Sequence, residues 1–406
     1  MTEATEPRAG IYVHIPYCHS KCAYCDFYST PARTGIDLFV DAVRRELDSR
    51  QHETAGHRIA TIYLGGGTPS SLPENQLRKL LEILPVGEAQ EITIEVNPED
   101  VSERMAGFIA ESPINRVSMG IQTLDDDQLR FIGRRHSAAD AIAAYERLRT
   151  AGIGNLSLDL IFGLPGQTAE SWKRTLSGTL ALGPDHLSAY TLMLEEGTRL
   201  TAIVKAGKLT ETPDSEIERM YDEVCRQTDA AGFVHYEISN FARAGFESIH
   251  NSAYWDFTPY IGLGPGAHSF DGRTRRFNPS SLKKYLETPD SVTIAEEEST
   301  ADIINDYIMV RLRTARGLSL EELARRFGQK AADLTAAVAT LREADGELLR
   351  NGEWIRIPER SFLVSDPIIA SLFVDQESLA GRSYPPFPTL DLQRKTETEI
   401  EVVNLQ

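Results

Sequence analysis

The stretch GIYVHIPYCHSKCAYCDFYS, residues 10–29, decides the fold. It opens with an apolar, β-branched run, residues 11–15, which is typical of a buried strand. Cys18, Cys22 and Cys25 follow in a C-x3-C-x2-C spacing, so three of the chain's four cysteines lie within eight residues. Because a loop that leaves a strand can bring three thiolates onto one face, the spacing predicts an inorganic centre held by three cysteines.

The number of cysteines separates the candidate metal centres. A structural zinc site takes four ligands, as a rule with a second pair far downstream, and this sequence has no second cysteine pair. An iron–sulfur cluster also needs four iron ligands, so three cysteines leave one iron open to another molecule. Two alternatives stay open: a zinc loop completed by His14 or His19, and a set of unrelated buried cysteines.

The composition is that of a soluble globular protein, with 41% hydrophobic and 25% charged residues in a chain of 406. No run of about 18 apolar residues and no apolar signal core is present, so we expect a cytoplasmic protein. The net charge of −18 argues against nucleic acid as the main partner, because phosphate binding depends on basic patches. Cys225 falls within a helical pattern and is expected to be a small buried residue.

Strands and helices are expected to alternate in the first half of the chain. The expected strands are residues 11–15, 60–64, 91–96, 116–119, 156–161 and 186–192, and the helices between them are 36–50, 74–84, 101–110, 138–151 and 169–182. Such βαβ repeats predict a parallel sheet with right-handed crossovers. No strand leads into a G-x-G-x-x-G turn followed by an acidic residue at the expected distance, which disfavours a dinucleotide-binding fold.

Polar or glycine-rich positions follow the C-terminal ends of successive expected strands. They are the cysteine loop, residues 65–68, Glu95, Gln122, Asp159 and Tyr190. In a (β/α) barrel, ligand sites are built at this rim. The fold class expected is therefore α/β, with a partial (β/α)6 TIM-like barrel whose site lies at the rim.

Beyond residue 192 the alternation ends. A helix over 214–231 and a strand over 233–238 precede a loop-rich region, 239–269, that contains HNSAYW and GLGPGAHS. Helices over 302–313, 319–327 and 331–344, followed by a hairpin over 347–357 with Asn351-Gly352 at its turn, predict a winged-helix-like domain. Its basic residues are offset by acidic neighbours, so a lid or partner-docking role is favoured over DNA binding.

The domains expected are a barrel over residues 1–240, a connecting region over 241–300, a winged-helix-like domain over 301–375 and an extended or disordered tail over 376–406. The tail contains Pro385-Pro386-Phe387-Pro388.

The cysteine spacing resembles that of radical S-adenosylmethionine (SAM) proteins. YVHIPYCHSKCAYC, YLGGGTPS, EVNPE, GIQTLDD, SLDLIFGLPGQT and the C-terminal domain together resemble the family of oxygen-independent coproporphyrinogen III oxidases and related haem chaperones, over residues 11 to 373. The resemblance implies a [4Fe–4S] cluster on the three cysteines, with the fourth iron bound by the amino and carboxylate groups of SAM. It also implies SAM contacts from Tyr12, Tyr24, Gly66, Gly67, Thr68, Glu95, Gln122, Arg134, Asp159 and Ile161.

Several of these residues also have ordinary structural interpretations. The glycine segment is by itself a tight βα turn, Glu95 a solvated carboxylate at a strand end, and Ile161 a core residue. Arg134 stands in GRRH, so Arg135 is an alternative for its role.

Three departures from the oxidase pattern favour the haem chaperones. Phe27 stands where the oxidase type has a further cysteine, and the extended N-terminal segment of the oxidases is not expected, since the first strand begins about ten residues in. HNSAYW resembles the H-N-x-x-Y-W motif of the chaperones, which implies haem contacts from His250, Asn251, Tyr254 and Trp255. Imidazole is a common haem ligand and aromatic rings can stack on a porphyrin. Without the family, His250 is a histidine that caps a loop beside aromatic core.

The function expected is therefore that of a haem carrier built on a radical SAM scaffold, and not of an enzyme. Its expected partners are haem and an unidentified haem-acceptor protein, membrane-associated acceptors included, and the chain is expected to act as a monomer or homodimer without nucleic acid. The alternative is a radical SAM enzyme, either one that decarboxylates coproporphyrinogen III oxidatively or one with another substrate.

Overall fold

The computed structural model describes residues 6–290 and 293–380, so most of the predicted tail, with Pro385-Pro386-Phe387-Pro388, lies outside the described residues. The chain forms two compact units, one of residues 1–250 and 258–296, the other of 251–257 and 297–406. The boundary at 296 and 297 lies near the predicted division at residue 300, whereas most of the predicted connecting region belongs to the first unit.

All six predicted strands are present in the first unit. They are β1 (Arg8–Ile15), β2 (Arg58–Gly66), β3 (Glu91–Val96), β4 (Arg116–Gln122), β5 (Leu156–Phe162) and β6 (His186–Thr191). Each pairs in parallel with the next in chain order. The helices between them are α1 (Ile36–Arg50), α2 (Glu74–Ile83), α3 (Glu103–Glu111), α4 (Asp126–Ile132), α5 (Ala138–Thr150) and α6 (Ala169–Ala181), with short 3-10 turns at Gln51–Thr54, Pro69–Ser71 and Pro98–Asp100.

The parallel sheet is longer than predicted. β9 (Tyr260–Leu263) adds a parallel strand beside β1, and antiparallel strands continue the sheet at both edges. These are β10 (His268–Phe270), β11 (Arg275–Phe277) and β12 (Ile294–Ala295) beyond β9, and β8 (Asn240–Ala242) and β7 (Val234–Glu237) beyond β6. The remaining helices of this unit are α7 (Arg199–Lys205), α8 (Asp214–Ala230), α10 (Leu282–Glu287) and the start of α9 (Ile249–Trp255). The region predicted to be loop-rich therefore contains strands and a helix.

Local sequence signals set the helix starts. Ser137 and Thr168 each accept a backbone N–H from the third helical residue, which completes a capping box at α5 and at α6. Ser102 caps α3 through the N–H of Met105, so this helix begins two residues after its predicted start. Because the Ser102 side chain accepts a backbone N–H of the first turn, Ser102 stands at the cap position and the helix starts at the next residue.

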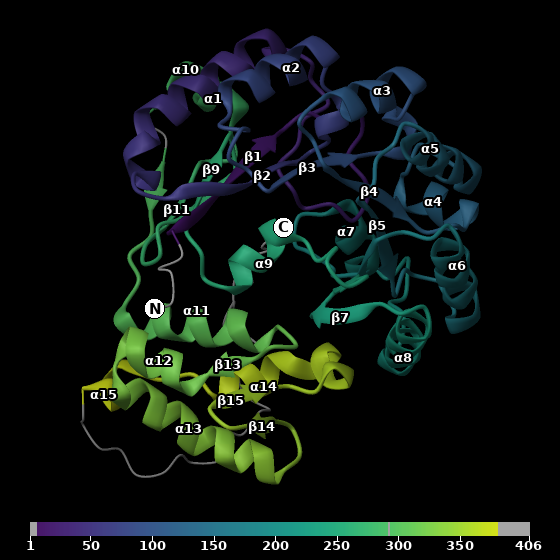
Figure 1. Ribbon diagram of the computed structural model, residues 1–406. Helices are drawn as coiled ribbons and strands as arrows, with labels where there is room; N and C mark the ends of the chain where they lie inside the picture. Colours follow the sequence, from purple (N-terminus) through teal and green to yellow (C-terminus); the bar gives the residue numbers. More distant parts are fainter. Residues whose placement is uncertain (1–5, 291–292, 381–406) are drawn as a thin grey trace. The chain divides into compact units, whose positions relative to one another are not determined.

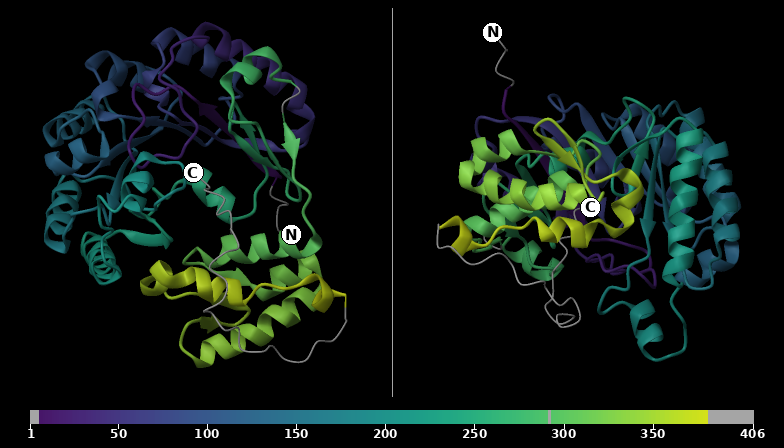
Figure 2. Two further views of the ribbon diagram at one scale, coloured as in Figure 1. Left: turned by 180° about the vertical axis from the view of Figure 1, so that it is seen from behind. Right: turned by 90° about the horizontal axis from the view of Figure 1, so that it is seen from below.

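The two faces of the sheet differ in polarity. Helices lie on its outer side, as Figures 1 and 2 show, and outward residues such as Ile62, Ile94 and Leu158 are fully buried. Because side chains alternate along a strand, every second residue faces inward. The inward set is polar: Thr61 and Tyr63 on β2, Glu91, Thr93 and Glu95 on β3, Arg116 and Ser118 on β4, Ser157 and Asp159 on β5, and His186, Ser188 and Tyr190 on β6. A closed TIM barrel fills this space with apolar layers, so the inner face here is suited to a polar ligand.

A buried carboxylate ties α1 to the edge of the sheet. Glu46 has no exposed surface and accepts hydrogen bonds from the Gly264 N–H at 2.9 Å, the Asn278 amide at 2.7 Å and the Tyr285 hydroxyl at 2.7 Å. Arg50, one turn further along α1, donates to it at 2.8 Å. One side chain therefore fixes the loop after β9 and helix α10.

The second unit contains the predicted winged-helix elements. Helices α11 (Thr300–Leu312), α12 (Leu320–Phe327) and α13 (Gln329–Ala344) accompany an antiparallel sheet of β13 (Leu318–Ser319), β15 (Trp354–Arg356) and β14 (Leu349–Asn351). A 3-10 turn (Glu359–Val364), α14 (Ser365–Ser371) and α15 (Gln376–Leu379) follow. Within residues 6–290 and 293–380, no helix is long and apolar enough to span a lipid bilayer.

Candidate functional site

The cysteine loop is an irregular segment between β1 and α1 that backbone hydrogen bonds hold in place. The Cys18 N–H donates to the carbonyl of Thr30 at 3.1 Å, and the Ala23 N–H donates to that of Ile132, at the end of α4, at 2.9 Å. His14 fixes the return of the loop, because its Nε2 lies 2.8 Å from the carbonyl oxygen of Tyr28. The loop is thus attached to β1 and to α4, and its shape does not depend on a disulfide, since all three thiols are free.

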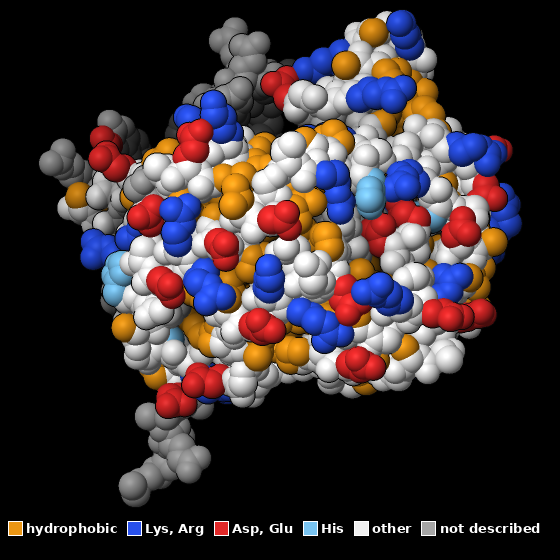
Figure 3. All heavy atoms as spheres, turned by 90° about the horizontal axis from the view of Figure 1, so that it is seen from above, with side chains coloured by type: hydrophobic (Ala, Val, Ile, Leu, Met, Phe, Trp, Pro, Cys, Tyr) orange, Lys and Arg blue, Asp and Glu red, His pale blue; other side chains and the backbone are white. Residues whose placement is uncertain are grey.

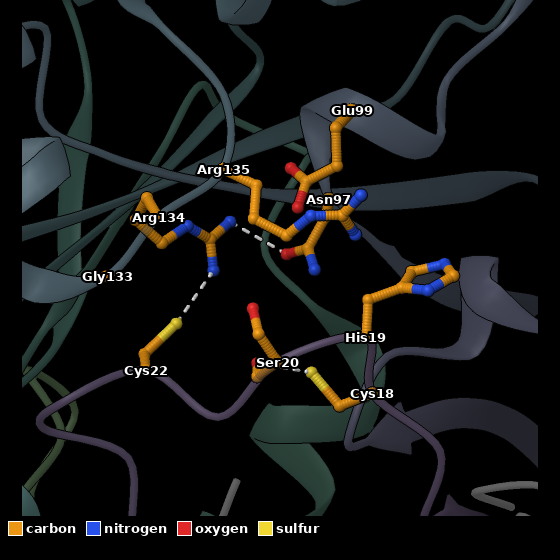
Figure 4. A pocket seen from close by; sticks show the side chains of 9 residues that line it. All are labelled: Cys18, His19, Ser20, Cys22, Asn97, Glu99, Gly133, Arg134 and Arg135. Carbon is orange, nitrogen blue, oxygen red and sulfur yellow. Dashed lines mark hydrogen bonds between the residues drawn. The ribbon is translucent and has the colours of Figure 1, made fainter. Parts of the chain in front are cut away.

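A small pocket lies beside this loop. It is lined by Cys18, His19, Ser20, Cys22, Asn97, Glu99, Gly133, Arg134 and Arg135. Figure 4 shows that the sulfur atoms of Cys18 and Cys22 and the guanidinium of Arg134 are directed toward the space between them. These residues follow β1, β3 and α4, so the pocket lies at the predicted rim of the barrel.

A chain of hydrogen bonds connects two of the thiols. Arg134 donates from Nη1 to the sulfur of Cys22 at 3.7 Å and from Nη2 to the Asn97 side-chain oxygen at 2.7 Å. The Asn97 amide nitrogen donates to the Thr68 hydroxyl at 3.1 Å, and that hydroxyl lies 3.2 Å from the sulfur of Cys18. The Thr68 hydroxyl has a single hydrogen, for which the sulfur competes with the carbonyl of Gly67 at 2.6 Å.

A charged guanidinium lies beside the sulfur of Cys22. Burial by itself lowers the pKa of Arg134, but the neighbouring Tyr24 and Cys22 raise it on balance, so the guanidinium is charged. Burial, with a contribution from Cys22, raises the pKa of the Cys25 thiol to about 12. Cys25 is therefore protonated in the metal-free protein, and binding of iron there would release a proton.

The donor set fits a cluster better than a single ion. Among the described residues, no group of three His, Cys, Asp or Glu side chains converges on one metal-ion position. When two thiolates bind one tetrahedral metal ion, each sulfur lies ~2.3 Å from the ion, and the two sulfurs lie within roughly 4 Å of each other. In a [4Fe–4S] cluster each thiolate binds a different iron, so the ligands stay further apart. Arg134 also has a buried Nε without a hydrogen-bond partner, as expected beside a site that takes an anionic group.

The glycine turn after β2 packs beneath the cysteine loop. Gly66 has φ +108°, and a Cβ there would lie 2.8 Å from the His14 ring. A Cβ at Gly67 would lie 2.8 Å from the carbonyl oxygen of Tyr17, while the Gly67 N–H donates to that of Ile15 at 2.8 Å. Close packing against β1 therefore requires both glycines, in addition to any role in ligand approach.

Two predicted acidic residues lie on the inner face, where both are half-buried. Glu95 accepts from the Tyr63 hydroxyl at 3.0 Å and from the Gly66 N–H at 3.1 Å, and burial raises its pKa to about 7. Asp159 accepts from the hydroxyls of Ser118 at 2.8 Å and Ser157 at 3.1 Å. The Glu95 carboxylate is thus fixed by two hydrogen bonds within the protein and is not simply solvated at the strand end.

The remaining predicted SAM residues lie around the same rim. Gln122 has φ +63°, a left-handed conformation that costs a non-glycine residue roughly 1–2 kcal/mol, at a bulge in β4. Tyr24 packs against an apolar group that includes Ile161 and Leu164, so Ile161 is both a core residue and a neighbour of the cysteine loop. The Tyr12 hydroxyl lies 3.2 Å from Nδ1 of His14.

HNSAYW lies on a helix, α9, and not in the predicted loop. Glu91 of β3 caps this helix by accepting the N–H groups of Ile249 and His250, each at 2.9 Å, so a carboxylate compensates the exposed donors of the first turn. His250 is 1% exposed, its Nδ1 lies 2.8 Å from the Thr61 hydroxyl, and its ring stacks on Tyr63 at 5.1 Å. Burial, with a contribution from Arg116, lowers the pKa of His250 to about 3, which keeps the imidazole neutral.

His250 and the predicted cluster residues therefore lie at opposite ends of the strands. Thr61 and Glu91 belong to the N-terminal parts of β2 and β3, whereas the pocket follows their C-terminal ends, roughly 15 Å further along at ~3.3 Å a residue. Asn251, Tyr254 and Trp255 belong to the second unit, where Arg311 donates to the carbonyl of Trp255 at 3.2 Å. Tyr254 and Trp255 are buried and Asn251 is half-buried.

Sequence reasoning missed the connecting residues of the pocket. Asn97 joins Thr68 to Arg134 through hydrogen bonds. A carboxylate oxygen of Glu99 lies 3.1 Å from Nδ1 of His136. A signal was present in EVNPE, because an Asn-Pro pair directly after a buried strand places a polar side chain at the rim. Arg134, not Arg135, contacts a cysteine, although both line the pocket.

Comparison with known proteins agrees with this arrangement. Residues 12–177 match the model of the radical SAM superfamily, and residues 299–364 match that of the HemN C-terminal domain. The structure resembles that of the coproporphyrinogen III oxidase HemN from Escherichia coli, a radical SAM enzyme, with a TM-score of 0.77 and 23% identity over 92% of both chains. This likeness confirms the predicted fold class.

Two curated relatives identify the family. The chain is 36% identical to the haem chaperone HemW of Bacillus subtilis, over 84% of this chain and 93% of that one. It is 34% identical to the haem chaperone HemW of Mycobacterium tuberculosis, over 89% of this chain and 94% of that one. The family resemblance predicted from the motifs is thus confirmed, and the chain belongs to the HemW family of radical SAM proteins.

Proposed function

We propose that this protein is a haem chaperone, which binds haem and passes it to an acceptor protein. The observation that carries the proposal is the similarity to proteins named haem chaperones along nearly their full length. Phe27 and HNSAYW support it, because both depart from the oxidase pattern in the direction of the chaperones.

The cysteine loop is proposed to hold a [4Fe–4S] cluster, as membership of the radical SAM superfamily implies. Cys18, Cys22 and Cys25 would hold such a cluster, and its remaining iron would be the binding point for SAM. Arg134 then stabilises the anionic sulfur of Cys22, and Asn97 keeps Arg134 in position. The proposed SAM contacts are Tyr12, Tyr24, Gly66, Gly67, Thr68, Glu95, Gln122, Asp159 and Ile161.

The proposed haem ligand, His250, is closed to solvent in the described conformation. Its ring lies between Thr61 and Tyr63, and its backbone N–H donates to Glu91. Haem therefore reaches the imidazole only when the first turn of α9 separates from β2 and β3. Asn251, Tyr254 and Trp255 follow on the same helix, so a movement of α9 changes the exposure of the whole motif.

Titration with haem tests the proposed function. Wild-type protein is expected to give a saturable Soret band, and His250→Ala is expected to lose the low-spin imidazole signature and at least about tenfold in affinity. Thr61→Val is the matched variant, because it removes a hydrogen bond that holds the ring and leaves the imidazole intact. It should bind haem faster than wild type.

If the wild-type protein does not bind haem, the proposed function is wrong. Unchanged affinity and spectrum in His250→Ala would move the ligand to another residue. Anaerobic conversion of coproporphyrinogen III to protoporphyrinogen by the reconstituted protein would instead support the oxidase alternative.

SAM binding is expected to depend on pH through Glu95. Its pKa of about 7 means that the carboxylate, the better acceptor for a ribose hydroxyl, forms as the pH rises through 7. At pH 6 about a tenth of the sites are ionised, so affinity is expected to be about tenfold below its plateau at high pH. In the SAM-free protein, the free energy of unfolding depends on pH in the opposite sense. Because the pKa of Glu95 is higher in the folded protein than in the unfolded chain, protonated Glu95 stabilises the fold at low pH, and this contribution is lost as the pH rises from about 4.5 to about 7.

Calorimetric titration of the cluster-loaded protein with SAM, at several pH values, measures this dependence. Glu95→Gln is the control and should bind SAM with no pH dependence in this range. An equally steep dependence in Glu95→Gln would assign the titration to another group.

A further inference from the structure

Arg116 is a buried arginine with unsatisfied donors on the inner face of the sheet. It begins β4, is 1% exposed, and its Nε and Nη1 are buried without a hydrogen-bond partner in the structure. These two nitrogens carry three N–H bonds. Leaving such donors unpaired away from water is costly, so a buried guanidinium in this state indicates a missing acceptor.

The neighbouring carboxylates do not supply that acceptor. Glu91 accepts from the backbone of Ile249 and His250, and Asp159 accepts from Ser118 and Ser157. Burial lowers the pKa of Arg116, but the negative charge of Glu91 raises it on balance, so the guanidinium stays charged. It acts on these carboxylates through space, while both accept their hydrogen bonds from other donors.

A second unsatisfied group lies next to Arg116. Thr93 pairs with Arg116 across the β3–β4 ladder, has no exposed surface, and has a hydroxyl without a partner. Tyr63 follows in the same row on β2, opposite Thr93, and stacks on His250. One row of the inner face therefore runs from the proposed haem ligand to the unsatisfied guanidinium.

We propose that Arg116 binds a carboxylate of the cargo, a propionate of haem, on the inner face of the sheet. This assignment rests on the proposed function. A carboxylate is the oxygen acceptor that a guanidinium binds most strongly, and the propionates are the anionic groups of haem. Glu95 and Asp159, higher on this face, are half-buried, so a polar ligand has access to the face from the rim. Release of α9 from Glu91 opens its lower row.

The test compares haem with haem dimethyl ester, in which both propionates are neutral. Wild-type protein is expected to bind haem roughly 10- to 100-fold more tightly than the ester, the range for hydrogen bonds to a charged group. Arg116→Met is expected to bind both compounds as weakly as wild type binds the ester. Arg147→Met is the matched control, because Arg147 is an exposed arginine on α5, and it should keep the wild-type preference.

The outcomes separate this assignment from the proposed function. Equal binding of haem and ester by wild type overturns the assignment and leaves haem carriage intact. A preference that persists in Arg116→Met also overturns it. Failure of wild type to bind either compound overturns the proposed function, and the assignment with it. If Arg116→Met does not fold, Arg116→Lys, which keeps the charge without the planar fork, should show a reduced preference.

Discussion

Cys22→Ser is expected to leave the protein without an iron–sulfur cluster after anaerobic reconstitution. Serine removes one of three thiolates and also the acceptor of the Arg134 Nη1–H, so both the ligand set and its neighbouring charge are disrupted. Loss of a supporting residue costs about 10- to 100-fold in metal affinity, and loss of a ligand should cost no less. Iron and sulfide content, with the broad visible absorbance of the cluster, measure the effect.

Cys225→Ser is the matched control for that experiment. Cys225 is a half-buried thiol on α8, away from the cysteine loop in sequence, and its variant should keep full cluster content. Denaturant unfolding of the metal-free Cys22→Ser variant should match wild type, which separates loss of a ligand from loss of the fold. A Cys22→Ser protein with a normal cluster would exclude Cys22 as a ligand.

Glu46→Ala is expected to destabilise the first unit by about 3–5 kcal/mol, the usual cost of breaking a buried charge network. Its removal leaves the donors of Asn278, Tyr285 and Gly264 without their acceptor, and leaves Arg50 with Glu53 as its remaining carboxylate partner. Chemical denaturation of the metal-free protein measures the change.

Asp48→Ala, two residues further along α1, is the comparison for Glu46→Ala. Asp48 is exposed and accepts one hydrogen bond from Gln51 at 3.3 Å, so its removal should change stability by less than about 1 kcal/mol. Equal effects of the two variants would contradict a structural role for the Glu46 network.

Local pattern was enough to predict the barrel strands and the cysteine loop. In EITIEV the apolar residues alternate with Glu91, Thr93 and Glu95, which marks a strand with one apolar and one polar face. The C-terminal ends of parallel strands share one edge, so Cys18 and Thr68 were expected to meet near it, and the Thr68 hydroxyl lies 3.2 Å from the sulfur of Cys18. Arg134 was expected there from the family resemblance alone, and it donates to the sulfur of Cys22.

Features that depend on distant partners were not predictable. Helix α9 begins where Glu91, 158 residues earlier in the chain, caps it, and this distant carboxylate cannot be inferred from the residues around His250. The strand β9 is four residues long and gains its place by pairing with β1. Likewise, Arg116 reads as an ordinary strand residue, and the absence of partners for its Nε and Nη1 becomes visible only with the neighbouring strands in place.

Haem transfer tests the central proposal most directly. Cluster-loaded protein saturated with haem is mixed with an excess of a haem-free acceptor such as apomyoglobin, and the Soret band is followed over time. The account predicts that the spectrum of the loaded protein is replaced by that of the acceptor, and that Thr61→Val changes the rate. Protein that never acquires a Soret band, or that converts coproporphyrinogen III under reducing conditions, would contradict it.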